Sequence, residues 1–143
     1  MKDRRILLVE DNPDDEMLTL EALKEAKIDA PVDVVRDGEE ALNFVLRKGQ
    51  YAKRAEPLAT DVIILDLQLP KIDGLEVLKE IRSNKQTSKI PVVILSSSNE
   101  KRDVMAGYDR GANSFVVKPI DRAQFEKVVS LVGHYWCGIN ETP

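Results

Sequence analysis

The sequence has 143 residues, the size of one ordinary domain with its own hydrophobic core. With 43% hydrophobic and 32% charged residues, its composition is that of a soluble globular protein and excludes a disordered or fibrous chain. With a net charge of -4, the chain lacks the excess of basic residues that binding to a nucleic-acid backbone requires, so we expect no nucleic-acid partner.

The N-terminal segment and the single cysteine indicate a cytoplasmic protein. Residues 1–5 are polar, and the first apolar run, 6–9, is far too short for a signal-peptide core or a membrane span. Cys137 has no second cysteine with which to pair in the chain, which fits a reducing compartment. We therefore expect a cytoplasmic location and no membrane anchor.

Five short apolar runs predict five β-strands. They are rich in β-branched residues and continuous rather than alternating, a pattern typical of parallel strands that are covered on both faces. The runs are residues 6–9, 32–35, 62–65, 92–95 and 115–117, of which 32–35 is the weakest.

The first helix has a clear start signal directly after the first strand. Asn12 is suited to be the N-cap and Pro13 the first helical residue, and the acidic residues 14–16 face the positive end of the helix dipole. The residues expected on one face are Met17, Leu20, Leu23 and Ala26.

Four further helices are predicted in the segments that follow the other strands. The second contains Ala41, Leu42, Val45 and Leu46, and the third, beginning at residue 73 or 74, has Leu75, Leu78 and Ile81 on its inner side. A weaker fourth helix spans 100–110. The last begins at an N-cap, Asp121, and carries an amphipathic stripe of Phe125, Val128, Val129, Val132 and Trp136. Residues 49–60 are expected to form a surface loop.

Strand and helix thus alternate five times, which predicts a single domain over residues 1–143 without an output domain. The fold class expected is α/β: a flavodoxin-like, doubly wound (βα)5 domain whose five-stranded parallel sheet has the order 2-1-3-4-5. Ligands of such sheets bind beyond the carboxyl ends of the strands. The functional residues should therefore follow the strands.

Polar residues do follow four of the strands. They are Glu10 and Asp11 after the first, Asp66 after the third, Ser96 and Ser97 after the fourth, and Lys118 after the fifth. Each alone is compatible with an ordinary turn, cap or surface role. Together, three carboxylates at one edge would repel one another unless a cation neutralised them, and an oxygen-only set is suited to Mg2+. A metal, a lysine and a hydroxyl around one carboxylate suit phosphoryl transfer.

The motifs around these residues resemble those of the receiver domains of bacterial two-component response regulators, over essentially the whole chain. The matching segments are residues 8–11 with Pro13, 64–70 with Asp73 and Gly74, 91–96, and 115–119. The resemblance implies that Asp66 accepts a phosphoryl group from the phosphohistidine of a sensor histidine kinase, and that the protein is a phosphoacceptor rather than an enzyme acting on other molecules.

The same resemblance implies a role for each neighbouring residue. Asp11, Asp66 and the backbone carbonyl of Gln68 would hold Mg2+, with Glu10 acting through water. The phosphoryl oxygens would be held by Lys118, by Ser96 and by the backbone amides of Leu67 and Ser97. Ser96 and Phe115 would form the conformational switch, with Phe115 standing where many relatives carry tyrosine.

Three other functions compete with this interpretation. A flavodoxin-like electron carrier needs a phosphate-cradling first loop, which residues 10–15, being largely acidic, would repel. A phosphatase of the haloacid-dehalogenase type needs a second aspartate where Gln68 stands. A degenerate receiver would only bind proteins, yet every residue that phosphorylation needs is present.

The segment 49–60 and the aromatic tail at 134–138 resemble those of single-domain receivers that partner bacterial phytochrome histidine kinases. This likeness implies a light-regulated kinase as the phosphodonor. It also implies a homodimer packed through the last helix, where Leu131 and Tyr135 lie four residues apart beside the core stripe.

Overall fold

In the computed structural model, which describes residues 4–53 and 60–143, strands and helices alternate along the chain. The elements are β1 (Ile6–Val9), α1 (Pro13–Glu25), β2 (Val32–Val35), α2 (Gly38–Leu46), η1 (Gly49–Tyr51), β3 (Val62–Leu65), α3 (Gly74–Ser83), β4 (Val92–Ser96), α4 (Lys101–Asp109), β5 (Ser114–Val117), α5 (Arg122–His134) and η2 (Tyr135–Ile139). A helix lies between each strand and the next, and such helical crossovers are the connections that join parallel strands.

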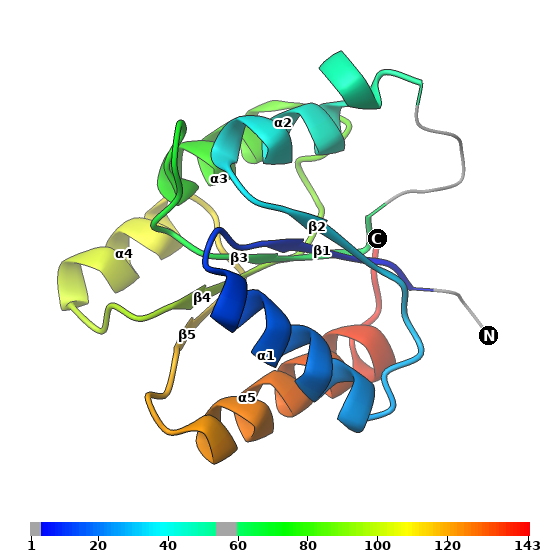
Figure 1. Cartoon of the computed structure of the whole chain (residues 1–143). Helices are drawn as coiled ribbons and strands as arrows, with labels where there is room; N and C mark the ends of the chain where they lie inside the picture. Colours follow the sequence, from blue (N-terminus) through cyan, green and yellow to red (C-terminus); the bar gives the residue numbers. More distant parts are fainter. Residues whose placement is uncertain (1–3, 54–59) are drawn as a thin grey trace.

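The strands form one parallel sheet in the order β2-β1-β3-β4-β5, which confirms the predicted flavodoxin-like fold. Figure 1 shows α1 and α5 against one face of this sheet and α2 and α3 against the other. Each face has its own apolar core, because the continuous apolar strands offer side chains to both sides. The sheet is therefore buried between two helical layers.

The strand register brings the polar residues to one edge. Val9 pairs with Leu65, so the residues after β1 and β3 are neighbours, and the Asp66 N–H donates to the Val9 carbonyl at 3.1 Å. On the other side, the Lys118 N–H donates to the Ser96 carbonyl at 2.7 Å. The central strands thus present their terminal side chains to a common site.

The start of α1 agrees with the prediction, and its inner face agrees in part, since Leu23 is buried and Leu20 packs against the same core. Asn12 Oδ1 accepts from the N–H groups of Asp14 (2.9 Å) and Asp15 (3.2 Å), as an N-cap does. Met17, however, is 54% exposed, while Thr19 is fully buried and donates its hydroxyl to the Asp15 carbonyl at 2.8 Å. This hydrogen bond satisfies the Thr19 hydroxyl, so the residue can be buried without an unpaired polar group. A search for apolar residues at helical spacing does not find such a position.

The start of the segment 49–60 is anchored to α2. Its first residues form the short 3-10 turn η1, in which Tyr51 donates its hydroxyl to Glu40 Oε2 at 2.7 Å. The Tyr51 ring packs edge-on against Phe44, with 5.0 Å between centroids. Residues 54–59, the centre of the predicted loop, lie outside the described residues.

The C-terminal helix buries its predicted stripe and leaves a second face open. Phe125 and Val129 are buried in the core beneath α1 and α5. Leu131 and Tyr135 are 61% and 46% exposed, which leaves apolar surface at the end of the helix. Across residues 4–53 and 60–143, no helix combines the length and apolar character that crossing a bilayer requires.

Candidate functional site

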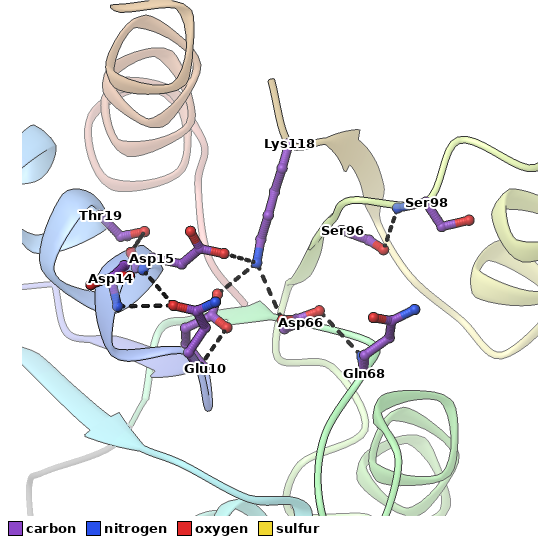
Figure 2. A network of polar contacts seen from close by, with 10 residues as sticks. Glu10, Asp14, Asp15, Thr19, Asp66, Gln68, Ser96, Ser98 and Lys118 are labelled. Carbon is purple, nitrogen blue, oxygen red and sulfur yellow. Dashed lines mark hydrogen bonds and ion pairs between the residues drawn. The ribbon is translucent and has the colours of Figure 1, made fainter. Parts of the chain in front are cut away.

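The Lys118 ammonium lies at the centre of the polar edge of the sheet (Figure 2). Its Nζ donates to Glu10 Oε1 at 2.8 Å, to Asp15 Oδ2 at 2.9 Å and to Asp66 Oδ2 at 3.2 Å. The Lys118 side chain is only 8% exposed. Since an ammonium has three N–H groups, each of them has a carboxylate partner.

Asp66 follows β3 directly and is also buried. Its Oδ2 accepts from Lys118, and its Oδ1 accepts from the backbone N–H of Gln68 at 3.2 Å. The backbone behind it is held by Gly74, where an added Cβ would lie 2.5 Å from the Asp66 carbonyl oxygen. Only glycine therefore lets α3 begin this close to Asp66.

Glu10, Asp11 and Asp66 form an acidic trio in which one carboxylate oxygen of each lies within 4.8 Å of the others. Glu10 and Asp66 are buried and Asp11 is exposed, so the trio has one side open to solvent. An oxygen-only set with solvent access fits a hard divalent cation such as Mg2+, which keeps several of its waters. Gln68, also predicted as a ligand, lies beside Asp66 and is exposed.

Burial and the neighbouring polar groups together shift the pKa values of Glu10 and Lys118. Burial raises the pKa of Glu10 to about 7, helped by its hydrogen bond with Asp66 and opposed by Lys118. Burial alone would lower the pKa of Lys118, but its carboxylate partners outweigh burial and raise that pKa. Lys118 therefore stays charged. Three carboxyl groups surround this one ammonium, so acidic groups outnumber cations at the site.

Ser96 ends β4 beside this cluster and is 1% exposed. Its Oγ accepts from the backbone N–H of Ser98 at 3.2 Å. The Ser98 hydroxyl in turn donates to Asp103 Oδ2 at 2.5 Å and accepts from the Glu100 N–H at 3.3 Å. Ser96 is thus connected through Ser98 to the first turn of α4.

Phe115, the second predicted switch residue, lies half-buried on the sheet face that α4 covers. An added Cβ at Gly107 of α4 would lie 3.0 Å from Phe115 Cδ2 and 2.8 Å from Ile94 Cδ1. The close approach of α4 thus depends on a glycine, and the Phe115 ring fills the space below it.

The structure brings Glu10, Asp11, Asp66 and Lys118 together as expected, and it adds Asp15, which sequence reasoning assigned only to the helix dipole. A signal was available in its position. Asp15 is in the first turn of α1, and helical Cα–Cβ bonds tilt toward the N-terminus, so its side chain reaches back to the strand edge. Figure 2 shows the Asp15 and Lys118 side chains meeting in this way.

Comparison with known proteins identifies the family. Residues 6–130 match the response regulator receiver domain. The chain belongs to this family. This receiver is 39% identical to the response regulator Rcp1 of Synechocystis sp. (strain ATCC 27184 / PCC 6803 / Kazusa), over 92% of this chain and 87% of Rcp1.

Solved structures agree with that assignment. The phosphorylated cyanobacterial phytochrome response regulator RcpA is 37% identical, with a TM-score of 0.92 over 99% of both chains. The bacteriophytochrome response regulator RtBRR is 46% identical, with a TM-score of 0.79 over 99% of this chain and 85% of that one. The Mn(2+)-bound form of Rcp1 has a TM-score of 0.90 and is 36% identical over 98% of this chain and 99% of that one. The predicted likeness of this receiver to phytochrome response regulators is confirmed.

Proposed function

We propose that this receiver accepts a phosphoryl group on Asp66 from the phosphohistidine of a sensor histidine kinase, in a reaction that depends on Mg2+. The observation that carries the proposal is the position of Asp66, whose carboxylate belongs to the acidic trio and is also bonded to Lys118 at 3.2 Å. A nucleophilic carboxylate between a cation site and an ammonium is what phosphoryl transfer to an aspartate requires.

In the transfer, an oxygen of Asp66 attacks the phosphorus atom and forms an acyl phosphate. The phosphorus–nitrogen bond breaks, and its electron pair stays on the imidazole of the donor. Lys118, already positioned at Asp66 Oδ2, supplies a positive charge to the phosphoryl oxygens. Ser96 and the backbone amides of Leu67 and Ser97 are the further donors in this proposal.

The donor set supports a divalent cation at the trio. Asp11 and Asp66 would bind Mg2+ directly with the Gln68 carbonyl, and Glu10 would act through water. When bound, Mg2+ neutralises negative charge on the phosphoryl oxygens and the carboxylates. The Mn(2+)-bound form of Rcp1 supports the presence of a cation in such a receiver.

The proposed output is a change of protein surface. Phosphoryl oxygens on Asp66 attract the Ser96 hydroxyl, and the space that it leaves allows Phe115 to move inward. The receiver is proposed to act in the cytoplasm. The signal then passes to another protein by contact, and the receiver promotes no reaction beyond its own phosphorylation and dephosphorylation.

The kinase that we propose is a bacterial phytochrome, on the strength of the phytochrome response regulators RcpA and RtBRR. The receiver is further proposed to act as a homodimer through the exposed side chains of Leu131 and Tyr135. Tyr135→Ala should then weaken self-association, measured by size exclusion with light scattering. Tyr108→Ala is the matched control, since Tyr108 on α4 is 50% exposed, close to the 46% of Tyr135. A monomeric parent, or a Tyr135→Ala dimer as stable as the parent's, would refute the interface.

The phosphoacceptor assignment is tested with acetyl phosphate and Mg2+. The parent should gain one hydroxylamine-labile phosphoryl group, visible by intact mass spectrometry, and lose this ability in EDTA. Asp66→Asn should not be labelled, whereas Asp73→Asn should be, because Asp73 is an exposed N-cap whose capping role asparagine also fills. Equal labelling of the parent and Asp66→Asn would exclude Asp66 as the acceptor.

A further inference from the structure

The ion pair between Asp15 and Lys118 is distinct from the acidic trio. Asp15 belongs to α1 and uses its Oδ2 to bond Lys118 Nζ at 2.9 Å, shorter than the 3.2 Å bond from Lys118 to Asp66. The Lys118 side chain is 8% exposed and that of Asp15 is 29% exposed. Lys118 therefore has one solvent-facing anionic partner in addition to Glu10 and Asp66.

We propose that Asp15 is a positioning residue that holds Lys118 in the unphosphorylated receiver and thereby lowers the affinity of the site for a phosphoryl group. The proposal rests on the phosphoacceptor role of Asp66 and deepens it. Asp15 sets how readily Lys118 changes from binding carboxylates to binding the phosphoryl oxygens.

The number of donors on Lys118 supports this role. All three N–H groups of the ammonium are engaged, by Glu10, Asp15 and Asp66. A phosphoryl group has three strong acceptor oxygens, so a single N–H facing Asp66 serves it poorly. A second N–H becomes available only when Lys118 releases a partner. Asp15 is the partner that water can replace, because Glu10 is 2% exposed.

The Asp15 carboxylate also acts through its charge. Its Oδ2 and Asp66 Oδ2 bond the same nitrogen, at 2.9 Å and 3.2 Å, so they lie no more than about 6 Å apart. At such a distance a partly buried anion repels an incoming phosphoryl group with little screening by salt. Competition for Lys118 and repulsion therefore act in the same direction.

The backbone of Asp15 is held on both sides, which keeps its side chain aimed at Lys118. Its N–H donates to the N-cap Asn12 at 3.2 Å, and its carbonyl accepts from the buried Thr19 hydroxyl at 2.8 Å. Asp15 and Lys118 also line one cavity of about 250 Å³ together with Ser97, whose amide is proposed to bind phosphoryl oxygens. The pair and Ser97 therefore border one common space.

Beryllofluoride, an analogue of the phosphoryl group, tests the proposal in the presence of Mg2+. Its dissociation constant is measured by 19F NMR for the parent, Asp15→Asn and Asp14→Asn. Asp14 is the matched control, because it is the preceding residue in the same helical turn and is exposed, and its side chain has no contact with Lys118 in Figure 2. Asp15→Asn should bind beryllofluoride about fivefold more tightly than Asp14→Asn, the size of effect expected of one partly exposed ion pair.

Thermal unfolding separates positioning from a merely structural role. Loss of the ion pair should lower the Tm of the ligand-free Asp15→Asn protein, whereas the increase in Tm on adding beryllofluoride should exceed that of the parent. A structural lesion would reduce both quantities. Asp15→Glu, which keeps the charge, should return the dissociation constant toward the parent value.

The possible failures are distinguishable. Beryllofluoride affinity in Asp15→Asn that is equal to or weaker than in Asp14→Asn overturns the role of Asp15. If beryllofluoride binds neither the parent nor Asp66→Asn, or binds both equally, the phosphoacceptor role of Asp66 fails, and the proposal for Asp15 fails with it.

Discussion

The hydroxyl of Tyr108 accepts a hydrogen bond from the backbone N–H of Phe115 across 3.2 Å. Phe115 belongs to β5, the outermost strand on its side of the described sheet, and Tyr108 belongs to α4. The bond therefore satisfies an N–H group at the sheet edge with a side chain from the neighbouring helix. Although residue 115 has no phenolic hydroxyl of its own, a phenol on α4 is bonded to its backbone.

Tyr108→Phe should lower the free energy of unfolding by about 0.5 kcal/mol, the lower end of the range for a hydrogen bond, because water can replace the lost partner at this exposed position. Urea denaturation followed by circular dichroism measures the change. Tyr135→Phe deletes the same atom from another exposed tyrosine and should leave stability closer to that of the parent. Equal losses in the two variants would contradict a role for this bond.

Gly107→Ala should be destabilising by about 1–3 kcal/mol, because the new methyl would overpack the layer between α4 and the sheet. Its Cβ would lie 2.8 Å from Ile94 Cδ1 and 3.0 Å from Phe115 Cδ2. The clash should outweigh the better helix propensity of alanine. Gly138→Ala is the control, since nothing lies within 4 Å of an added Cβ there. A Gly107→Ala protein as stable as the parent would show that α4 and Phe115 adjust freely.

The fold was predictable from the sequence because its signals are local and repeated. β1, β3 and β4 contain continuous apolar runs, and β2 and β5 are mostly apolar. The caps of α1, α3 and α5 are the predicted residues or lie within one of them. The strand-end residues of the site were also predictable, since parallel strands in this order must bring their carboxyl ends together.

The side-chain contacts between distant helices and strands were not predictable in the same way. Asp15 has the sequence context of an ordinary first-turn acid, and only the packing of α1 shows that it reaches Lys118. Thr19 is polar, and only its bond to a helical carbonyl explains its burial. Tyr108 was expected simply as a member of the fourth helix, and its bond to β5 depends on how closely α4 approaches the sheet.

Arg82 connects the two loops that precede β4 and β5, at the end of the sheet away from Asp66. Arg82→Lys should be destabilising by about 2 kcal/mol. Its guanidinium donates to the carbonyls of Gly111 (2.9 Å), Ile90 (2.7 Å) and Ser88 (3.1 Å), and to Asn113 Oδ1 (2.8 Å). Burial lowers the pKa of Arg82, but guanidinium stays protonated at neutral pH. Lysine cannot reproduce this planar set of donors, so several half-buried acceptors would lose their partners.

Arg122→Lys provides the comparison for Arg82→Lys. Arg122 bonds two carboxylates at the surface, and its side chain is 66% exposed, so its replacement should change stability by well under about 1 kcal/mol. Both variants are measured by urea denaturation. The role of Arg82 as a connection between the loops is wrong if the two substitutions have similar effects.

The affinity of the acidic trio for Mg2+ should decrease as the pH falls from 8 to 6. Burial, with a contribution from Asp66, raises the pKa of Glu10 from 4.5 to about 7, so Glu10 gains a proton within this interval. A protonated Glu10 contributes no negative charge to the trio, and Mg2+ must displace that proton to bind tightly. Well below pH 7 the dissociation constant should rise by up to about tenfold per pH unit, as expected when one proton is released on binding.

The same pKa shift affects the metal-free protein in the opposite sense. Between about pH 4.5 and 7 the folded state holds a proton on Glu10 that the unfolded state releases, so this residue's contribution to the free energy of unfolding declines as the pH rises. Isothermal titration calorimetry at pH 6, 7 and 8, in buffers of different ionisation enthalpy, measures both the Mg2+ affinity and the protons released. Glu10→Gln should bind Mg2+ more weakly, with a much flatter pH dependence over this interval. A parent whose Mg2+ affinity is constant from pH 6 to 8 would exclude a proton on Glu10 near neutral pH.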